Sequence, residues 1–225
     1  MSKATQVDIF YIHVPPKEPL EGYLAGINTL YTKHAAFKRF GLSNFSATQV
    51  EEVYDHCRAH DYVLPTVYQG NYNPVARKQE TVLFPTLRRL GIAFYAYSPM
   101  AGGFLTKTKQ DVMDGKGRFD VNTRPGKMYH GLYARPSMLE SLEFWDEAAK
   151  TEGCSKGELA YRWVAHNSAL SAEHGDAIII GASKSDQIIS AIEGLKKGRI
   201  GDRAMKMIDE VWEKVRDEAP LDNMS

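Results

Sequence analysis

Length, composition and charge limit the chain to one broad class of protein. Its 225 residues are 43% hydrophobic and 25% charged, which is ordinary for a globular domain with a substantial core. Twenty-eight basic residues balance 28 acidic residues, so no net field attracts nucleic acid or an acidic membrane. Cys57 and Cys154 lie far apart, and no apolar run approaches the roughly 18 residues of a membrane span. We expect a soluble cytoplasmic protein.

Five apolar runs along the chain predict β-strands. The first, VDIFYIH at residues 7–13, indicates a buried strand that ends in His13. Four further runs lie at residues 37–44, 65–73, 92–99 and 176–183. Helical patterns separate successive runs, which is typical of parallel strands joined by right-handed crossovers with helices on the convex face. The carboxyl ends of such strands meet on one rim, and polar residues cluster at these ends in this sequence.

Helices are predicted between and after these strands. A stripe of apolar residues begins at Leu20, either Ser46 or Thr48 is placed to cap a second helix, and Gly91 ends a third helix over residues 77–90. Further helices are expected over residues 137–152, 155–167, 185–195 and 202–218. The last of them carries an apolar face made of Met205, Ile208, Trp212 and Val215. By contrast, residues 101–136 have no sustained period and predict a long rim loop within a single domain of residues 1–225.

Seven short sequences, in a fixed order, resemble the aldo-keto reductase superfamily, and most closely its aflatoxin-aldehyde-reductase branch. They are VDIFYIH, FGLSNFS, LPTVYQGNYNP, FYAYSPMAGGFLT, GRF at residues 117–119, HGDAIIIGAS and the DQI that follows. They extend from residue 7 to residue 188 with the family's order and spacing. The resemblance implies an α/β fold, the (β/α)8 TIM barrel, which reduces small carbonyl compounds with NADPH, often in secondary metabolism.

The resemblance also implies that this chain lacks the family's first three βα units. It would then form a partial barrel of five parallel strands, which match family strands 4 to 8. In the family, the preceding units hold the catalytic tyrosine, lysine and aspartate, whereas His13 matches the histidine that orients the substrate carbonyl. An imidazole at a strand end suits this task. The residues alone favour a core histidine that bonds to a neighbouring carbonyl group.

Four further positions match family residues that hold the nicotinamide of the cofactor. Ser43, Asn44 and Gln69 match residues that bind its carboxamide, for which amide side chains supply both a donor and an acceptor. Tyr97 matches the aromatic residue that stacks on the nicotinamide ring. From the residues alone, capping of strand ends by Asn and Gln and a core position for Tyr97 are the simpler interpretations.

The resemblance assigns the phosphates and the adenosine of the cofactor to segments after the last two strands. Small residues let backbone N–H groups approach phosphate oxygens, and the candidates around the pyrophosphate are Ser98, Met100 and Gly102. Arg118 matches a residue that clamps the phosphates. The matches around the ribose and its 2′-phosphate are Ser183, Lys184 and Gln187. Ser190 and Ala191 replace a Glu-Asn pair that contacts adenine in the family.

Two other groups of residues carry less weight. His56, Cys57 and His60 share a helix face, but no third and fourth ligands follow at a fitting spacing, so no metal site is expected. Tyr129 and Tyr133 fall in the expected rim loop, where they would suit a bulky or apolar carbonyl substrate.

Three interpretations of function remain open. The chain is a shortened NADPH-dependent aldo-keto reductase, a catalytically silent protein that binds nucleotide or a partner, or a non-functional remnant. The unmatched catalytic aspartate, tyrosine and lysine separate the first interpretation from the second. We expect convergence on one rim of His13, Asn44, Gln69, Tyr97 and Ser183. We also expect the isolated chain to associate through the open edges of its partial barrel and to reduce no carbonyl above background.

Overall fold

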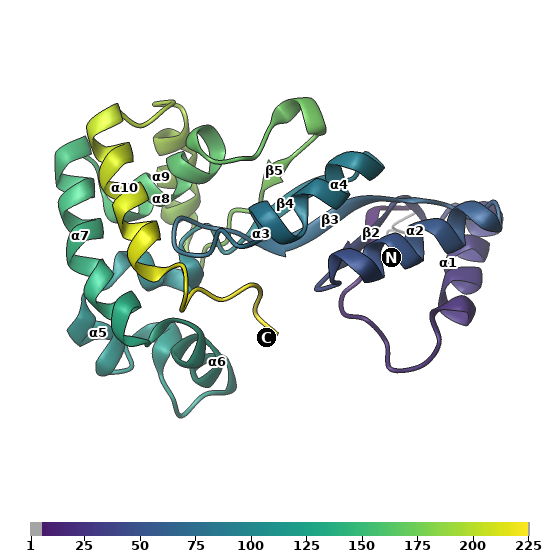
Figure 1. Cartoon of the computed structure of the whole chain (residues 1–225), viewed down its shortest axis with the longest axis horizontal. Coiled ribbons are helices and arrows are strands. Elements are labelled where there is room, and N and C mark those ends of the chain that lie inside the picture. The colour runs from purple at the N-terminus through teal and green to yellow at the C-terminus, as the bar shows by residue number, and fades with distance from the viewer. Residues whose placement is uncertain (1–5, 225) are drawn as a thin grey trace. The chain divides into compact units, whose positions relative to one another are not determined.

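The computed structural model describes residues 6–224, which include a five-stranded β-sheet (Figure 1). Its strands are β1 (Val7–Ile12), β2 (Phe37–Ser43), β3 (Pro65–Asn71), β4 (Ala93–Tyr97) and β5 (Ala177–Ile178). Their order in the sheet follows their order along the chain. β1 pairs in parallel with β2, and β2 pairs in parallel with β3. The predicted sheet of a partial barrel is confirmed, but β5 is far shorter than the apolar run of residues 176–183.

The described α-helices connect and flank these strands. They are α1 (Leu20–His34), α2 (Ala47–Ala59), α3 (Gln79–Val82), α4 (Phe84–Leu90), α5 (Lys109–Met113), α6 (Arg124–Tyr133), α7 (Pro136–Glu152), α8 (Lys156–Arg162), α9 (Ser185–Leu195) and α10 (Asp202–Val215). Short 3-10 turns lie at Ala101–Thr106, Gly117–Phe119 and Ala172–His174, and a π-turn at Trp163–Asn167 continues α8.

Helix ends follow the signals in the sequence. Ser46 and Gln49 form a capping box at the start of α2, in which each side chain accepts from the other's backbone N–H. At the start of α8, the Ser155 side chain accepts a hydrogen bond from Glu158 N. Gly91 ends α4 with a φ of 68°, a left-handed conformation that favours glycine.

Residues 101–136 differ from the loop that the sequence predicts. They contain α5, α6 and two 3-10 turns. Thr123 caps α6 by accepting a hydrogen bond from Gly126 N at 3.0 Å. Three aromatic side chains of the segment are fully buried: Phe104, Phe119 and Tyr133. Packing of these rings, rather than a regular apolar period, therefore stabilises the short helices.

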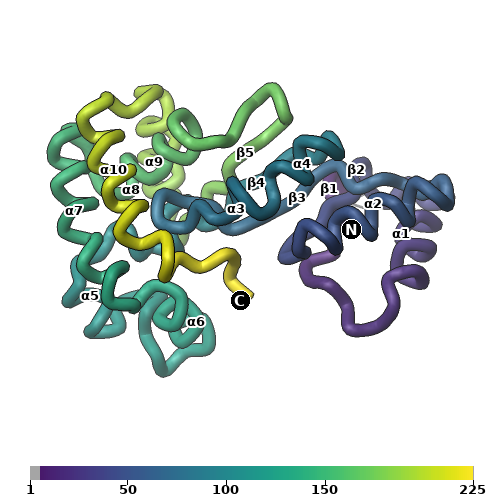
Figure 2. The backbone as a smooth tube through the Cα atoms, viewed as in Figure 1, coloured from purple at the N-terminus to yellow at the C-terminus, as the bar shows by residue number. Residues whose placement is uncertain are grey.

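The described residues form two compact units. Unit 1 consists of the residues up to Gly70, together with Thr81–Tyr95 and Ala172–Asp176. Unit 2 consists of Asn71–Glu80, Ala96–Ser171 and the residues from Ala177 onward. The chain can be followed through these stretches in Figure 2. The single domain expected over residues 1–225 stays a prediction, and residues 1–5 and 225 lie outside the described part.

Unit 1 has an aromatic core that reaches Asp176 across a long stretch of sequence. Phe94 on β4 stacks on Tyr68 with 5.8 Å between ring centres, and it meets Phe84 edge-on at 4.8 Å. Arg88 binds the Asp176 carboxylate through two hydrogen bonds of 2.9 and 2.6 Å. Asp176 also accepts a hydrogen bond from Phe94 N at 2.8 Å. Because the Asp176 side chain is only 1% exposed, these bonds compensate for burying its charge.

Unit 2 is built around the packed pair α7 and α10. Trp145 on α7 is fully buried, and the buried residues of α10 are Ala204, Ile208, Val211 and Val215. The predicted apolar face of this last helix is correct for Ile208 and Val215. Met205 and Trp212 are only partly buried. The helix ends at Val215 rather than near residue 218.

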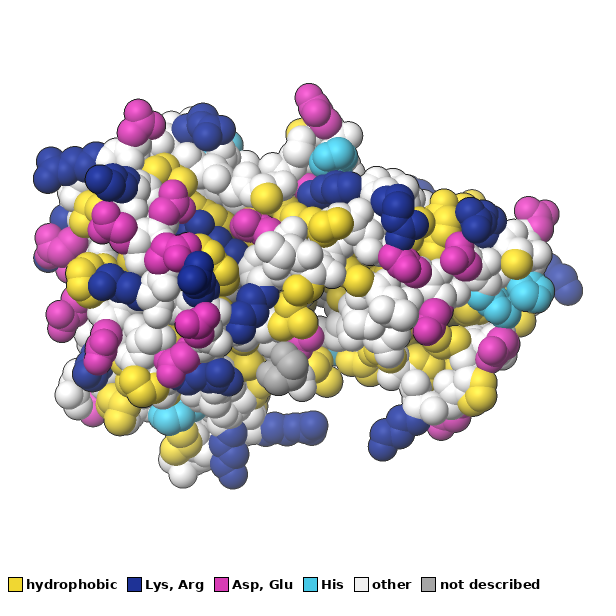
Figure 3. Space-filling model, viewed as in Figure 1, with side chains coloured by type: hydrophobic (Ala, Val, Ile, Leu, Met, Phe, Trp, Pro, Cys, Tyr) yellow, Lys and Arg dark blue, Asp and Glu magenta, His cyan; other side chains and the backbone are white. Residues whose placement is uncertain are grey.

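Charges are mixed on the surface, and large apolar side chains are exposed in both units. Acidic and basic side chains are interspersed over the visible face (Figure 3), as the balanced composition leads one to expect. No helix within residues 6–224 is long and apolar enough to cross a membrane. Exposed apolar residues in unit 1 include Val7, Phe10, Tyr23, Leu30 and Tyr31 on β1 and α1. In unit 2 they include Ile188, Ile189 and Ile192 on α9.

Candidate functional site

The carboxyl ends of β1 and β2 bring His13 and Asn44 together in unit 1. Both residues directly follow their strands. The Asn44 side-chain amide donates to the main-chain oxygen of His13 at 2.8 Å and to Ser43 Oγ at 3.2 Å. Asn44 has a φ of 61°, a left-handed conformation in which asparagine is enriched among non-glycine residues. The bond fixes the backbone that carries the His13 imidazole.

The third strand adds Gln69 and holds the turn after β2 in place. Gln69 pairs in register with Ser43, so the two residues are neighbours in the sheet. Tyr68 accepts a hydrogen bond from Phe45 N at 3.1 Å, and its hydroxyl donates to Phe45 O at 2.8 Å. Four predicted site residues therefore lie together in unit 1: His13, Ser43, Asn44 and Gln69. His13 is exposed, whereas Ser43 is 1% exposed and Gln69 lies two residues before the end of β3.

The remaining predicted residues belong to unit 2. Tyr97 is the last residue of β4, and its main-chain oxygen accepts from Tyr72 N at 3.2 Å. The segment Ser98–Gly103 follows, with Asn73 Nδ2 donating to Ser98 O at 3.2 Å. His13, Asn44 and Gln69 belong to unit 1, whereas Tyr97 and Ser183 belong to unit 2. Their convergence on one rim stays a prediction.

The segment after β4 bends sharply and carries three of the predicted phosphate contacts, Ser98, Met100 and Gly102. Ser98 and Ala101 have φ of 56° and 52°, and Gly102 and Gly103 have φ of 67° and 101°. Consecutive backbone N–H groups in such turns form concave sites for anions. Arg118 lies on the 3-10 turn Gly117–Phe119, with an exposed side chain. The N–H groups of Ala101 and Gly103 donate within the turn, to Ser98 O at 2.8 Å and Met100 O at 2.9 Å, so the exposed guanidinium of Arg118 is the group here that best fits a phosphate.

A second cluster lies at the start of α9. Gln187 Oε1 accepts hydrogen bonds from Ser183 N at 2.9 Å and from Ser183 Oγ at 3.3 Å. Lys184 is the residue before the helix, and all three predicted side chains are exposed. Ala191 is 5% exposed, so it packs inward and presents no polar group to an adenine. Because the N–H and hydroxyl of Ser183 both donate to Gln187, Lys184 is the group of this cluster that best fits a phosphate.

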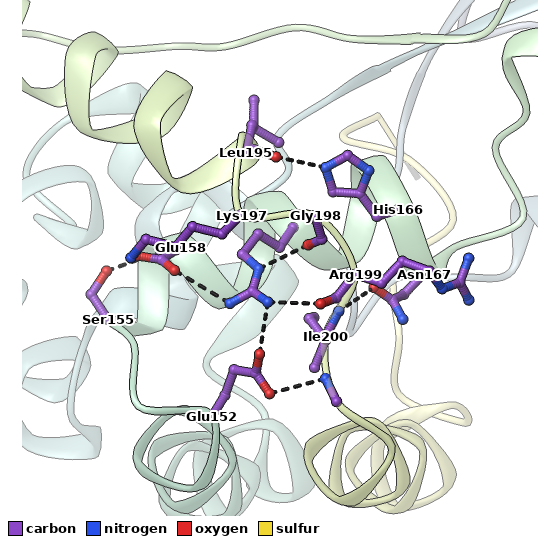
Figure 4. Close-up of polar contacts among 12 residues, drawn as sticks. Glu152, Ser155, Glu158, His166, Asn167, Leu195, Lys197, Gly198, Arg199 and Ile200 are labelled. Atoms are coloured by element: carbon purple, nitrogen blue, oxygen red, sulfur yellow. Dashed lines mark hydrogen bonds and ion pairs between the residues drawn. The ribbon is translucent and has the colours of Figure 1, made fainter.

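At the C-terminal end of α9, the buried side chain of Arg162 forms a network of hydrogen bonds. Figure 4 labels its partners Glu152, Glu158, Gly198 and Arg199. Arg162 donates to Glu152 at 2.7 Å, to Glu158 at 3.3 Å and to the main-chain oxygens of Gly198 and Arg199 at 3.0 and 2.8 Å. Its side chain is 6% exposed. His166 bonds to Leu195 O at 2.8 Å, and Asn167 accepts from Ile200 N at 2.9 Å. These bonds fix the segment that leads out of α9.

Tyr129 and Tyr133 are buried, so the expectation that they contact a substrate from a rim loop is wrong. They are 7% and 0% exposed. Tyr133 accepts hydrogen bonds from the amides of Asn71 and Asn73, each at 3.4 Å, and burial raises its pKa to about 12. Asn71 and Asn73 were not among the predicted site residues, and the signal that could have indicated them is their alternation with Tyr72 at the end of β3.

The histidine cluster on α2 shows no ligand arrangement. The His56 and His60 rings stack with 4.2 Å between centres, and His60 Nδ1 lies 2.9 Å from His56 O. Within residues 6–224, no group of three or more His, Cys, Asp or Glu side chains could hold a metal ion.

Comparison with known proteins identifies a matching family and several similar proteins. The aldo/keto reductase family model matches residues 2–213. The chain is 35% identical over 216 residues to Oxidoreductase sirO of Leptosphaeria maculans, covering 96% of this chain and 65% of that protein. It is 36% identical over 224 residues to Aflatoxin B1 aldehyde reductase member 2 of Homo sapiens, covering 96% and 62%. An aldo-keto reductase of Pseudocercospora fijiensis is 36% identical over 215 residues, with 94% and 72% covered. The chain thus spans about two thirds of the length of these relatives.

Proposed function

Because the chain belongs to the aldo/keto reductase family, we propose that it acts in the NADPH-dependent reduction of an aldehyde or ketone to an alcohol. The observation that carries the proposal is the strand-end cluster of unit 1, in which Asn44 bonds to the His13 backbone and Gln69 lies beside Ser43. These are the residues for which the resemblance implies contact with a carbonyl and a carboxamide. A place in secondary metabolism, which the resemblance implies, is part of the same proposal.

In this proposal each side chain has a binding task. The His13 imidazole donates a hydrogen bond to the substrate carbonyl oxygen and thereby orients it. Asn44 and Gln69 hold the carboxamide of the cofactor, and Tyr97 covers one face of its ring. NADPH, when bound, would supply the hydride, and the reduced oxygen would take its proton from water, because the family's catalytic tyrosine is unmatched here.

The phosphate-bearing part of the cofactor falls to unit 2. Arg118 and the Ser98–Gly103 segment hold the pyrophosphate, and Ser183, Lys184 and Gln187 hold the 2′-phosphate. The printed names of the relatives add support at the level of the reaction, since they include an oxidoreductase and an aldehyde reductase. NADPH is proposed over NADH because Lys184 offers a cation where a 2′-phosphate would stand.

The test combines binding with turnover. NADPH and NADH are titrated against the chain by cofactor fluorescence, and NADPH oxidation is then followed with an aromatic aldehyde and with a dicarbonyl. His13→Ala is compared with His34→Ala, an exposed histidine at the end of α1. Turnover that His13→Ala abolishes and His34→Ala preserves supports the reductase. Tight NADPH binding with no turnover assigns the chain to the catalytically silent alternative, and no binding of either cofactor overturns the proposal.

A further inference from the structure

The Ser98–Gly103 segment holds a costly backbone conformation. Ser98 and Ala101 have φ of 56° and 52°, although both carry a Cβ. Each such residue costs on the order of 1–3 kcal/mol and persists only where its surroundings impose it. Asn73 holds Ser98 O, and Ala101 N also donates to that oxygen at 2.8 Å. Because the segment carries candidate phosphate contacts, the side chains that hold it in this conformation matter for binding.

Tyr129 on α6 is that element, because its ring lies directly against Gly102. A Cβ built at Gly102 would overlap the ring of Tyr129. Tyr129 is 7% exposed, so its ring is packed among other side chains. Gly102 also has a φ of 67°, so both the close approach and the backbone angle require glycine here.

The same ring also supports Arg118. The guanidinium carbon of Arg118 lies 5.9 Å from the centre of the Tyr129 ring, within the range of a cation–π contact. The next residue, Phe119, is fully buried and packs 6.2 Å from the Tyr129 ring. One aromatic side chain therefore contacts both candidate pyrophosphate groups, the glycine turn and the arginine.

α6 is itself held firmly, which makes Tyr129 a rigid support. Phe104 stacks on Tyr133 with 5.4 Å between centres and an interplanar angle of 21°. At the other end of the helix, Gly126 packs so closely on the Asp120 carbonyl that a Cβ would collide with it. Residues 101–136, which the sequence predicts to be a loop, are therefore packed, and Tyr129 in this segment contacts Arg118.

We propose that Tyr129 is a positioning residue, which sets Arg118 and the Ser98–Gly103 turn at the spacing that a dinucleotide pyrophosphate requires. The inference rests on the proposed function, since it concerns the phosphate end of the same cofactor site. Tyr129 acts through its ring, so phenylalanine should replace it, whereas an aliphatic side chain should not. A structural role alone would affect every ligand equally. A positioning role affects only ligands that carry the pyrophosphate.

The experiment uses two probes with the full chain: NADPH, which has the pyrophosphate, and 2′-AMP, which has only the adenosine and its 2′-phosphate. Dissociation constants are measured by calorimetry for the wild type, Tyr129→Phe, Tyr129→Leu, Arg118→Met and the Tyr129→Leu/Arg118→Met double variant. A cation–π contact of about 0.5–2 kcal/mol predicts a ~2- to 30-fold loss of NADPH affinity in Tyr129→Leu. Tyr129→Phe should bind as the wild type does, and 2′-AMP affinity should not change. The double variant should lose less NADPH affinity than the two single losses combined, because they share the Arg118 contact, but more than Arg118→Met alone, because the Ser98–Gly103 turn also loses its support.

Gly102→Ala serves as a second route to the same displacement, should Tyr129→Leu fold poorly. It forces the ring and the turn apart without removing the ring, and it should weaken NADPH but not 2′-AMP. Equal losses for both ligands, or unchanged NADPH affinity in Tyr129→Leu, would overturn the inference alone. If the wild type binds neither ligand, the proposed function fails first and the inference fails with it.

Discussion

The side-chain amide of Asn44 donates a hydrogen bond to the main-chain carbonyl of His13 over 2.8 Å. Two residues that are distant in sequence, each at the end of a parallel strand, are thereby joined at the rim of unit 1. Since Asn44 adopts a φ of 61°, the bond depends on a backbone angle that few side chains tolerate.

Asn44→Ala should lower the free energy of unfolding by about 1–3 kcal/mol, because it removes the bond and places alanine in a left-handed conformation. Asn44→Gly also removes the bond but tolerates the angle, so it should cost about 1 kcal/mol less. Urea unfolding followed by circular dichroism measures both. Equal losses would show that the angle at this position is relaxed.

Arg162→Met should be among the most damaging single substitutions, at about 3–5 kcal/mol, because it removes the hydrogen bonds of a buried guanidinium and takes one partner from each of Glu152 and Glu158, whose side chains are 15% and 14% exposed. The triple variant with Glu152→Gln and Glu158→Gln should recover much of this loss in denaturant unfolding. Arg58→Met is the control, since its ion pair with Asp55 has an arginine side chain that is 69% exposed. A loss no larger than that of the control would contradict the role assigned to the network in Figure 4.

Two glycines of α6 should respond in opposite ways to alanine. Gly126→Ala forces a Cβ against the Asp120 backbone and should destabilise the chain by about 1–3 kcal/mol. Gly131 has nothing within 4 Å of its Cβ position, so Gly131→Ala should be neutral or stabilising by up to about 1 kcal/mol. Thermal unfolding of both variants tests whether residues 124–133 are helical in solution, since a loop would show no such contrast.

The contribution of Glu218 to the free energy of unfolding should decrease at low pH. Hydrogen bonds from Ser137, at 2.5 Å from Oγ and 2.9 Å from N, lower the pKa of the Glu218 carboxyl. Because its folded-state pKa lies below its unfolded-state value, the stabilisation is present above the usual glutamate range and is lost as pH falls through the folded-state pKa. The difference in unfolding free energy between the wild type and Glu218→Gln should therefore shrink below about pH 4.5. A difference that stays constant as pH falls through the usual glutamate range would contradict this expectation.

The uncovered apolar residues of β1 and α1 should cause the isolated chain to self-associate. β1 is the first strand of the sheet, and Val7 and Leu30 are 48% and 40% exposed. Sedimentation velocity over a concentration series should show larger species, and the double variant Val7→Lys/Leu30→Lys should shift them towards monomer. Met113→Lys, at a residue that is 57% exposed elsewhere, should change nothing. A wild-type monomer at every concentration would refute this expectation.

The parts of the fold that sequence alone could predict are those with strong local signals. Ser46, Ser155 and Gly91 mark helix ends because capping chemistry is local. The first four strands follow apolar runs of ordinary length. Local contacts were enough, because each signal lies within a few residues of the feature it predicts.

The misjudged parts depend on distant contacts. α6 has two glycines and a proline, so its period is poor, although Thr123 followed by Pro125 is a helix-start signal that could have revealed it. The burial of Tyr129 and Tyr133 depends on partners from other segments, including Gly102 and Asn73. The site residues were located by resemblance, and their spacing alone would have left most of them as caps or core.

The Arg88–Asp176 pair has a consequence for how the chain is made. Unit 1 needs Asp176, yet the whole stretch Ala96–Ser171 belongs to unit 2 and is synthesised before Asp176. Arg88 therefore emerges from the ribosome well before Asp176 has been synthesised. Unit 2 is also incomplete when Arg88 emerges. Neither unit can be completed during translation until residue 176 has emerged, so the early strands must wait with an unpaired arginine and an open core.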